Sequence, residues 1–476
     1  MKNAYLWLKF DTRLIIKQLP KLALVLFSSS IFAAPRELQS VIDDYVNEGM
    51  HSNLALQGET YAVQQAQATL NAARAHYLPE LSFDARYTRS HGGRSIDFPI
   101  GDALNPVYST LNQMLQAQGQ PGNFPQIQNL SIPLLRDREQ DTHLSLRQPI
   151  FAPAIGAGVD AQKAMLGATQ QQRIAVARQL KRDITVAYLN WLKASNVVQI
   201  VSGTHELLAE NLRVNESLFN NGKVTQDQPL RARAELLDVE QQLQQATNAQ
   251  QQAKSYVNFL LNRSLDTPLE ESAIPTELNA LAIDLVQSQQ QAVSQRAELQ
   301  QLDKATLAAQ HQVDIARAAS IPTLSLGVDS GIEGADYKFD SQHRYTTASL
   351  LLSWKFYAGG GMHAQVDAAN AQARRLSAQR DSAQQQVALQ VEQTVNRYRT
   401  TIASLSVATA RADVGRAVFR IASRKRDEGV INQTEFLDAR NALTTAELNL
   451  NLTRFAVLSE IAELEYTTAN GVLPLP

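Results

Sequence analysis

The sequence predicts an α+β membrane protein in which four short strands per chain continue into long coiled-coil helices. Three observations indicate this. Four runs alternate apolar and polar residues with a period of two, and two much longer stretches carry apolar residues at alternating spacings of three and four. The whole series of elements also occurs twice along the chain. The expected molecule is therefore elongated and internally duplicated.

The composition narrows the class of protein further. The chain has 476 residues and a formal net charge of -2, so no overall field favours nucleic acid as a partner. Because it contains no cysteine, disulfides, thiolate metal sites and a lipid-anchored N-terminal cysteine are excluded. Aromatic residues make up only 6% of the chain, which is typical of long helices and coiled coils.

The N-terminus has the order of an export signal. Basic residues lead, a short apolar core follows at 22–32, and small residues come next. We therefore predict a signal peptide over 1–33, cleaved after Ala33; the alternative is a buried amphipathic helix. No later segment has the roughly 18 continuous apolar residues of a membrane helix. If this chain spans a membrane, it must do so with strands.

Internal repeats divide the chain into two similar halves. Four pairs of segments resemble each other in the same order: 75–81 and 318–324, the strand ends 150–152 and 356–358, 219–224 and 426–431, and 230–233 and 437–440. Several matches in one order favour a duplicated unit over chance. We predict a first structural repeat over 34–270 and a second over 271–476.

The alternating runs predict two strands in each repeat. The expected strands lie at about 81–89, 143–151, 324–331 and 346–357. Their polar face carries the full charges Asp84, Arg86, Arg147 and Lys355, which a water-filled lumen tolerates, so the pattern favours a membrane β-barrel. A soluble sandwich with one wet face is the alternative. Because four strands are too few to close a barrel, several chains must share it.

The long helical stretches predict two antiparallel hairpins, over 157–262 and 362–468. The first stretch carries a seam with 3-4 spacing, formed by Ala177, Leu180, Ile184, Ala187, Trp191, Ala194, Val198, Val201, His205, Leu208 and Leu212. Such a heptad seam predicts left-handed coiling of neighbouring helices. Gly222 and Gly429 stand where each helix must end and reverse. Side-by-side hairpins of this kind would form a long α-helical coiled-coil barrel.

No motif in the chain indicates catalysis, so no catalytic residue, metal site or cofactor is predicted. Gly359-Gly360-Gly361 lacks the Gly-Lys-Ser/Thr of a phosphate loop, and glycines here would let a strand turn into a helix. The His residues are scattered without the spacing of metal ligands. The pair Asp43-Asp44 is interpreted as charge in the first turn of a helix.

One acidic pair is a candidate functional site. Glu435 and Asp438 are three residues apart, so they share a helix face just past the Gly429 turn. In a symmetric assembly such carboxylates would repeat as a ring, and acidic rings at a constriction select cations. A solvated helix face is the alternative. The nearby basic run 424–426 would either hold this end shut or solvate it.

The segment between the first two strands is much longer than its counterpart in the second repeat. This loop, 90–141, is punctuated by Pro and Gly and has an apolar stretch at 104–115. We expect it to face outside and cap the mouth of the barrel. A mobile insertion without function is the alternative.

Together these features resemble the TolC-type outer-membrane efflux proteins. The signal peptide, the duplicated strand and hairpin unit, the strand entry at 78–83 and the Gly turns carry the resemblance over about 38–470. It implies a homotrimer with a shared barrel in the outer membrane and a helical barrel extending into the periplasm. It also implies a passive exit channel of a tripartite efflux pump or a type I secretion system. The implied partners are a periplasmic adaptor and an inner-membrane pump or secretion ATPase.

The resemblance also assigns roles to residues at the periplasmic end. Glu435 and Asp438 match the residues that form the periplasmic aperture. The hairpin turns that dock the adaptor correspond to Gly222, Val224, Gly429 and Val430. The sequence departs from the family at the residues that tie the aperture shut, because Arg426 and Ile431 stand where the family's best-known member has Tyr and Arg. Arg426 and Arg440 are the candidate tie residues in this chain. The alternative function is that of a periplasmic adaptor or structural coiled-coil protein. It is less favoured because adaptors carry one hairpin within lipoyl-like domains, whereas this chain has two hairpins.

Overall fold

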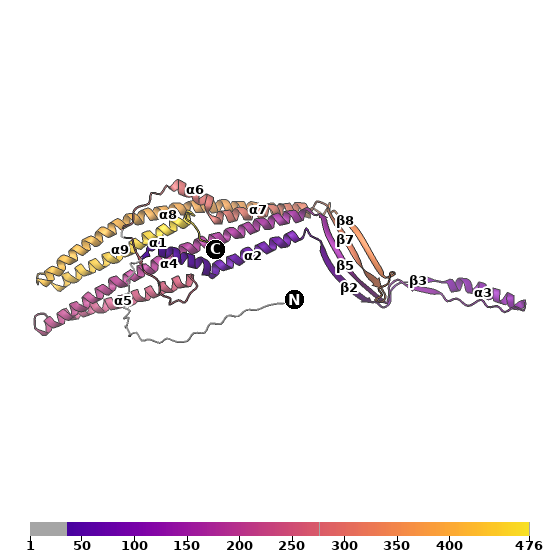
Figure 1. Cartoon of the computed structure of the whole chain (residues 1–476), viewed down its shortest axis with the longest axis horizontal. Helices are drawn as coiled ribbons and strands as arrows, with labels where there is room; N and C mark the ends of the chain where they lie inside the picture. Colours follow the sequence, from indigo (N-terminus) through magenta and orange to yellow (C-terminus); the bar gives the residue numbers. More distant parts are fainter. Residues whose placement is uncertain (1–35, 276, 476) are drawn as a thin grey trace, which may run out of the picture.

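The computed structural model describes residues 36–275 and 277–475. The predicted signal peptide, 1–33, lies outside them. The molecule is elongated: long helices occupy one end, a sheet follows, and a narrow extension projects beyond the sheet (Figure 1). No helix in the described residues has an apolar stretch long enough to cross a membrane.

The elements of the two halves follow the same order. The first half contains β1 (Arg36–Glu37), α1 (Leu38–Ser52), α2 (Leu54–Ala75), β2 (Glu80–Arg89), β3 (Ser95–Phe98), α3 (Ile100–Ala117), β4 (Leu130–Pro133), β5 (Arg138–Phe151), α4 (Pro153–Asn220) and α5 (Asp227–Leu260). The second contains β6 (Ser272–Ala273), α6 (Leu285–Gln295), α7 (Ala297–Ala318), β7 (Thr323–Gly334), β8 (Arg344–Ser353), α8 (Gly361–Asp427) and α9 (Gln433–Thr467). Only β3, α3 and β4 have no counterpart among the described residues. The short strands β1 and β6, which open the two halves, pair in parallel.

The main sheet has the antiparallel order β2-β5-β7-β8. Its register aligns the apolar positions of all four strands on one face, because Phe83 pairs with Leu144, Leu146 with Val328, and Leu326 with Leu350. On the edge strands these side chains are exposed in the single chain, with Phe83 68% and Leu350 67% accessible. On the inner strands, Leu146, Leu326 and Val328 are partly exposed. The sheet thus presents a continuous apolar face that the described part of the chain does not cover.

The last predicted strand ends earlier than expected. We predicted a strand over 346–357, but β8 stops at Ser353, which pairs with Thr323 at the start of β7. Pro322 precedes Thr323 and has no N–H to offer, so the ladder cannot continue on that side. Trp354 instead donates its indole N–H to the Ser320 carbonyl over 3.0 Å.

The long segment after β2 is folded rather than a simple loop. β3 and β4 form an antiparallel hairpin, α3 lies between them, and β5 already begins at Arg138. The expected loop 90–141 is therefore an extension with its own secondary structure. Its amphipathic apolar stretch, predicted at 104–115, lies on α3.

The two long helices span most of the molecule. α4 has 68 residues and α8 has 67, so each is about 100 Å long at 1.5 Å per residue. The predicted seam of α4 is buried from Ala177 to Trp191, and beyond Trp191 only Val201 and Leu208 of the predicted residues stay buried. Polar residues such as Ser195 and Thr204 are buried there instead, whereas Ala194 and His205 are only partly so. Ser195 accepts a hydrogen bond from Gln250 of α5 over 3.1 Å, and Thr204 pairs with Thr444 of α9 over 3.3 Å, so these contacts decide which positions are buried.

The largest apolar cluster lies midway along the helices. It joins α1, the start of α2, α4 and α5 with Phe455 of α9. Tyr188 at its centre is fully buried and donates its hydroxyl to the Glu270 carbonyl over 2.7 Å. Burial raises the pKa of Tyr188 to about 12. This cluster packs the segment that connects the two halves against the long helices. It lies away from both ends of the molecule.

Candidate functional site at the helical tip

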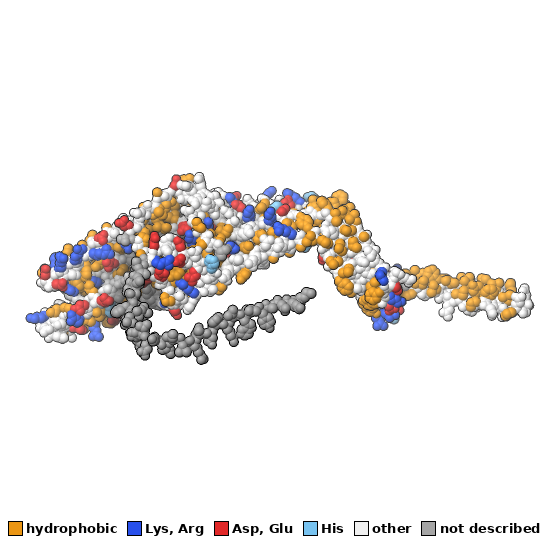
Figure 2. All heavy atoms as spheres, in the orientation of Figure 1, with side chains coloured by type: hydrophobic (Ala, Val, Ile, Leu, Met, Phe, Trp, Pro, Cys, Tyr) orange, Lys and Arg blue, Asp and Glu red, His pale blue; other side chains and the backbone are white. Residues whose placement is uncertain are grey.

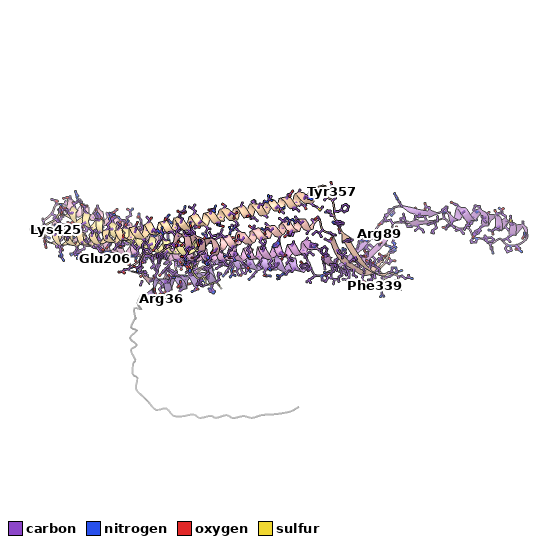
Figure 3. The ribbon with its side chains drawn as sticks, turned by 90° about the horizontal axis from the view of Figure 1, so that it is seen from above. Arg36, Arg89, Glu206, Phe339, Tyr357 and Lys425 are labelled. Atoms are coloured by element: carbon purple, nitrogen blue, oxygen red, sulfur yellow. The ribbon has the colours of Figure 1, made fainter. Side chains whose placement is uncertain are left out.

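The two hairpin turns, 220–227 and 427–433, form the end of the molecule farthest from the sheet, here called the tip. Lys425 marks this end in Figure 3, opposite Arg89 and Phe339. The turns share one geometry. Gly222 and Gly429 have φ of 69° and 74° and follow long helices, a conformation that glycine adopts without steric cost.

Matching backbone hydrogen bonds close both turns. Gly222 N–H donates to Phe219 and Lys223 N–H to Leu218, each over 2.9 Å. The second turn repeats this pattern from Gly429 and Val430, over 2.9 and 2.8 Å. This is the Schellman arrangement that satisfies the last carbonyls of a helix. The predicted reversal points therefore lie where the sequence placed them.

The first turn of α9 positions the acidic pair. Asn432 caps the helix by accepting the Glu435 backbone N–H over 2.9 Å, so the helix starts at a defined residue. Glu435 and Asp438 are both exposed on one face of α9. The opposite face carries Phe436 and Leu437, which are 1% and 7% exposed.

A small apolar cluster holds that opposite face. Phe436 and Leu437 pack with Val201 and Leu208 of α4 and with Val239 of α5. The start of α9 is thereby anchored to the first hairpin, and its orientation is set by burial. Because one face is fixed inward on this cluster, the acidic pair must face away from it.

Neither candidate tie residue contacts the acidic pair in the described chain. Arg426 pairs with Asp427 over 3.2 Å, and its guanidinium carbon lies 4.0 Å from the centre of the Phe436 ring. Such a stacked cation contributes about 0.5–1 kcal/mol at exposed sites. Arg426 therefore braces the second hairpin internally.

Arg440 connects the two hairpins instead. Its side chain is 5% exposed and donates to the Glu235 carboxylate of α5 over 3.2 Å. Burial lowers the pKa of Arg440, while the charges of Glu235 and Asp238 act in the opposite direction. Glu235 was not singled out from the sequence. Its one signal is position, two residues after the Leu-x-Ala-Arg match of the first repeat.

The adaptor-docking positions predicted at the turns are accessible. Val430 is 66% exposed, and Val224 is partly exposed. Phe219, just before the first turn, is 40% exposed. The last turn of α8 adds a basic run, 424–426, where cations suit the negative end of the helix dipole. The tip thus combines exposed apolar side chains with positive charge.

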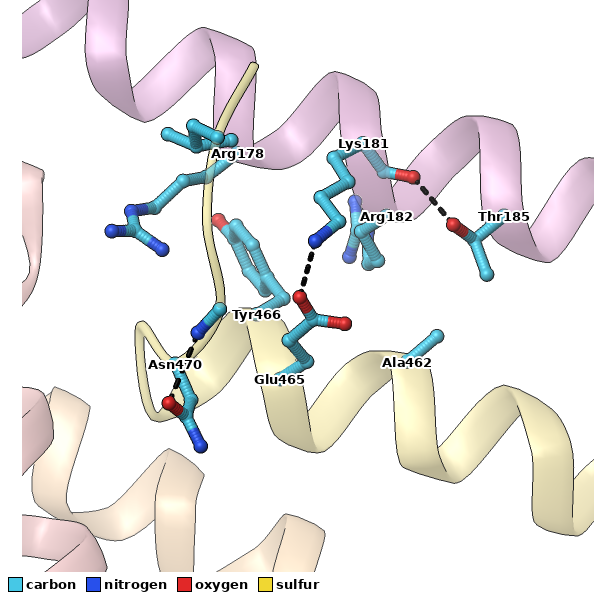
Figure 4. A pocket seen from close by; sticks show the side chains of 10 residues that line it. Arg178, Lys181, Arg182, Thr185, Ala462, Glu465, Tyr466 and Asn470 are labelled. Carbon is cyan, nitrogen blue, oxygen red and sulfur yellow. Dashed lines mark hydrogen bonds and ion pairs between the residues drawn. The ribbon is translucent and has the colours of Figure 1, made fainter. Parts of the chain in front are cut away.

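A second polar cluster lies near the C-terminal end of α9 (Figure 4). Lys181 of α4 pairs with Glu465, and the Arg182 guanidinium stacks 4.8 Å from the centre of the Tyr466 ring. Arg296 stacks on the same ring at 5.1 Å and bonds to Glu298 over 2.7 Å. The charges neutralise each other within the chain, which makes this cluster a joint between α4, α7 and α9.

Among the described residues, no three His, Cys, Asp or Glu side chains gather as a metal site would require. The candidate site is an exposed surface of charged and apolar side chains, at one end of a long helical body whose other end is a sheet with an apolar face. An exposed apolar sheet face is typical of a protein that spans a membrane with strands.

Comparison with known proteins agrees with this class. The family model for outer membrane efflux proteins matches residues 47–263 and 289–469. No sequence among curated proteins matched significantly. The chain belongs to the outer membrane efflux protein family: it is an efflux channel protein of the outer membrane and not an enzyme. This membership rejects the alternative of a periplasmic adaptor or free coiled-coil protein.

Solved structures share the fold at low sequence identity. The Campylobacter jejuni CmeC outer membrane channel superposes with a TM-score of 0.75 at 16% identity, over 96% of this chain and 94% of that one. The outer membrane protein VceC of Vibrio cholerae gives 0.71 at 17% identity, over 92% and 99%. The open state of the Neisseria gonorrhoeae MtrE outer membrane channel gives 0.69 at 16% identity, over 92% and 90%.

Proposed function

We propose that three copies of the chain form a passive exit channel that an adaptor opens at the periplasmic tip. The three sheets would make one barrel in the outer membrane, and the helices would extend into the periplasm as a tunnel. An inner-membrane pump or a secretion ATPase would supply the energy. The observation that carries this proposal is the sheet, with its uncovered apolar face and its two unpaired edges.

The sheet supports a shared barrel. In the described chain the outer edges of β2 and β8 have no strand partner, and unpaired edges are not tolerated in lipid. Three sheets of four strands give twelve strands, enough to close a barrel. The polar face, which includes Asp84, Arg86 and Asp329, would then line a wet lumen.

The helices support contacts between chains. α8 exposes an apolar row at heptad-like spacing, formed by Val407, Val414, Val418 and Ile421. α5 exposes Leu230 and Leu237, seven residues apart. Such rows pack well against another helix and poorly against water. We infer that the second hairpin of one chain packs against the first hairpin of the next.

The acidic pair would form the aperture. In a trimer, Glu435 and Asp438 give six carboxylates around the axis. Their mutual repulsion favours bound cations and resists closer approach. Arg440 and Glu235 would hold the second hairpin against the first in the closed state. The adaptor would engage the turns around Gly222, Val224, Gly429 and Val430 and move the second hairpin outward.

An internal duplication would explain the two halves, which we propose to divide at about 270. The recurring element order and the paired turns support it. The match of one family model to a segment in each half supports it as well. The two start strands, β1 and β6, lie side by side as corresponding elements would in a two-fold repeat.

Membrane fractionation and planar-bilayer recording test the proposed function. We expect the protein in the outer-membrane fraction, as a band on gels that heating converts from trimer to monomer. The purified trimer should conduct in discrete single-channel steps. A protein released entirely with soluble periplasmic material, or a membrane monomer without conductance, would refute the proposal.

A further inference from the structure

We propose that the α3 helices of three chains pack together on the channel axis and form a cap over the outer mouth. The occupant of the uncovered face of α3 is thus a second and third copy of this chain. This inference rests on the proposed trimer. It gives the extension between β2 and β5 a role that the channel function alone does not require.

The position of the extension suits a cap. It leaves the sheet at the end opposite the tip and continues along the long axis of the molecule (Figure 1). It also starts from β2, the edge strand through which the proposed barrel joins the next chain. Three copies arranged about the axis would therefore bring three extensions together beyond the barrel.

One side of α3 is already occupied within the chain. The Asn105 side chain exchanges two hydrogen bonds of 2.8 Å with the Ile127 backbone, and Asn112 does the same with Phe124 at 2.9 Å. Gly101 allows close approach, since a Cβ there would lie 2.3 Å from the Ile127 carbonyl oxygen. The returning segment 120–129 is therefore bound to this side, and α3 is held as a rigid unit.

The neighbouring side of α3 is apolar and uncovered. We call it the α3 seam: Ile100, Leu104, Val107, Leu111 and Met114. These side chains are 36–59% exposed in the single chain. Their spacing of four, three, four and three is that of a coiled coil. The α3 seam is therefore shaped for another helix.

The residue types on the α3 seam favour more than two helices. In heptad terms the spacing puts Leu104 and Leu111 at position a, and Ile100, Val107 and Met114 at position d. Leucine at a with β-branched residues at d shifts parallel coiled coils from dimers to higher oligomers. A threefold axis supplies three helices in parallel.

The distribution of charge along the extension indicates that lipid does not cover the α3 seam, because charged residues gather between this seam and the sheet. Between Phe98 and Leu135 the only charged residue is Asp102, whose carboxylate accepts a hydrogen bond from Asn129 over 2.9 Å. The base of the extension, in contrast, carries a charged collar formed by Arg89, Arg94, Asp97, Arg136, Asp137 and Arg138. Figure 2 shows these charges between the apolar sheet and the apolar extension. The collar separates α3 from the bilayer, so the α3 seam lies beyond the lipid.

The chain contains no cysteine, so single cysteines report on this packing directly. Leu111→Cys places a thiol on the α3 seam, and Gln113→Cys places one on the exposed polar side of the same helix. Disulfides need Cα atoms about 4.4–6.8 Å apart. On mild oxidation of the purified trimer, we expect Leu111→Cys to give disulfide-linked dimers, two of every three chains at most. On non-reducing gels, after heating has dissociated the trimer, the Gln113→Cys chains should run as monomers.

The possible failures are distinguishable. If both variants are trimers but Leu111→Cys does not crosslink and a water-soluble maleimide labels both equally, the cap is wrong while the channel proposal stands. If the Leu111→Cys variant crosslinks poorly and its thiol is shielded only when the trimer is in lipid vesicles, lipid covers the α3 seam and the cap is again wrong. If neither variant is a trimer, the proposed function fails and the cap fails with it.

Discussion

The two hairpins of the chain have the same turn but different chemistry beyond it. Both reverse through a glycine in the left-handed region, closed by the same pair of hydrogen bonds. Six and nine residues after the glycine, the second hairpin has Glu435 and Asp438, whereas the first has Gln228 and Arg231. The two helix faces therefore differ by three charges, from −2 to +1.

The two hairpins also differ in the contacts that hold the helix after each turn in place. Eleven residues after the glycine, Arg440 of the second hairpin is buried against Glu235, whereas its counterpart Arg233 is exposed. Asn432 caps α9, but no side chain caps α5. The comparison indicates that the turn is a shared structural element, whereas the residues after it distinguish the second hairpin, which we propose as the gate. We expect the hairpins to respond differently to equivalent changes.

Giving the second hairpin the residues of the first should have the largest effect. Glu435→Gln with Asp438→Arg removes the proposed acidic ring and adds a positive one. Planar-bilayer recordings in a salt gradient should show that cation selectivity is lost or reversed. The matched exchange, Gln228→Glu with Arg231→Asp, should change selectivity much less, and an equal effect from both would contradict an aperture confined to the second hairpin.

Removing the tie between the hairpins should have the next largest effect. Arg440→Met leaves Glu235 without its partner, and a hydrogen bond to a charged group contributes about 1.5–3 kcal/mol. We expect more frequent channel opening in single-channel records. Arg233→Met, at the exposed equivalent position, is the control, and no difference between the two variants would rule out the tie.

Replacing either turn glycine should have a moderate and equal effect. A left-handed conformation costs a non-glycine residue about 1–2 kcal/mol. Gly222→Ala and Gly429→Ala should therefore lower the temperature of trimer dissociation, measured on gels, by similar amounts. A large difference between them would mean that the turns are not the common scaffold.

The smallest effect should come from the joint in the middle of the tube. Burial by itself would raise the pKa of Glu298, but the hydrogen bond and charge of Arg296 outweigh it and lower that pKa below its ordinary value of 4.5. The stability from this group is complete above pH 4.5 and is lost as the pH falls through the lowered pKa. Glu298→Gln should flatten the pH dependence of thermal unfolding below pH 4.5 without changing selectivity. If the unfolding temperature of the variant depends on pH as steeply as that of the unmodified protein, the Arg296–Glu298 pair contributes nothing to stability.

Much of the fold could be predicted from local patterns. Period-two and heptad spacing located the strands and long helices, and glycine located both turns. The features that local patterns did not predict depend on contacts between elements that are distant in sequence. Strand β8 ends early because β7 begins after a proline. The α4 seam departs from its predicted residues beyond Trp191 because Ser195 and Thr204 bond to α5 and α9. The extension was expected to be a loop because the segment that returns along α3 has no periodicity. In the structure, hydrogen bonds between Asn side chains and its backbone hold this segment against α3.

The candidate site was predictable only in part. Sequence spacing put Glu435 and Asp438 on one helix face, and the structure adds the apolar anchor that orients it. Arg440 was expected to act on the aperture, but its partner in the chain, Glu235, lies on another hairpin 205 residues away. No local pattern links positions so distant in sequence, so this contact needed the fold.

The most direct test of the gate is the single-channel current of Glu435→Ala with Asp438→Ala in planar bilayers. Removing six carboxylates from the constriction should raise conductance and reduce cation selectivity, while Gln228→Ala with Arg231→Ala leaves both near those of the unmodified channel. If the double acid variant forms trimers and its conductance and selectivity are unchanged, the aperture does not lie at these residues.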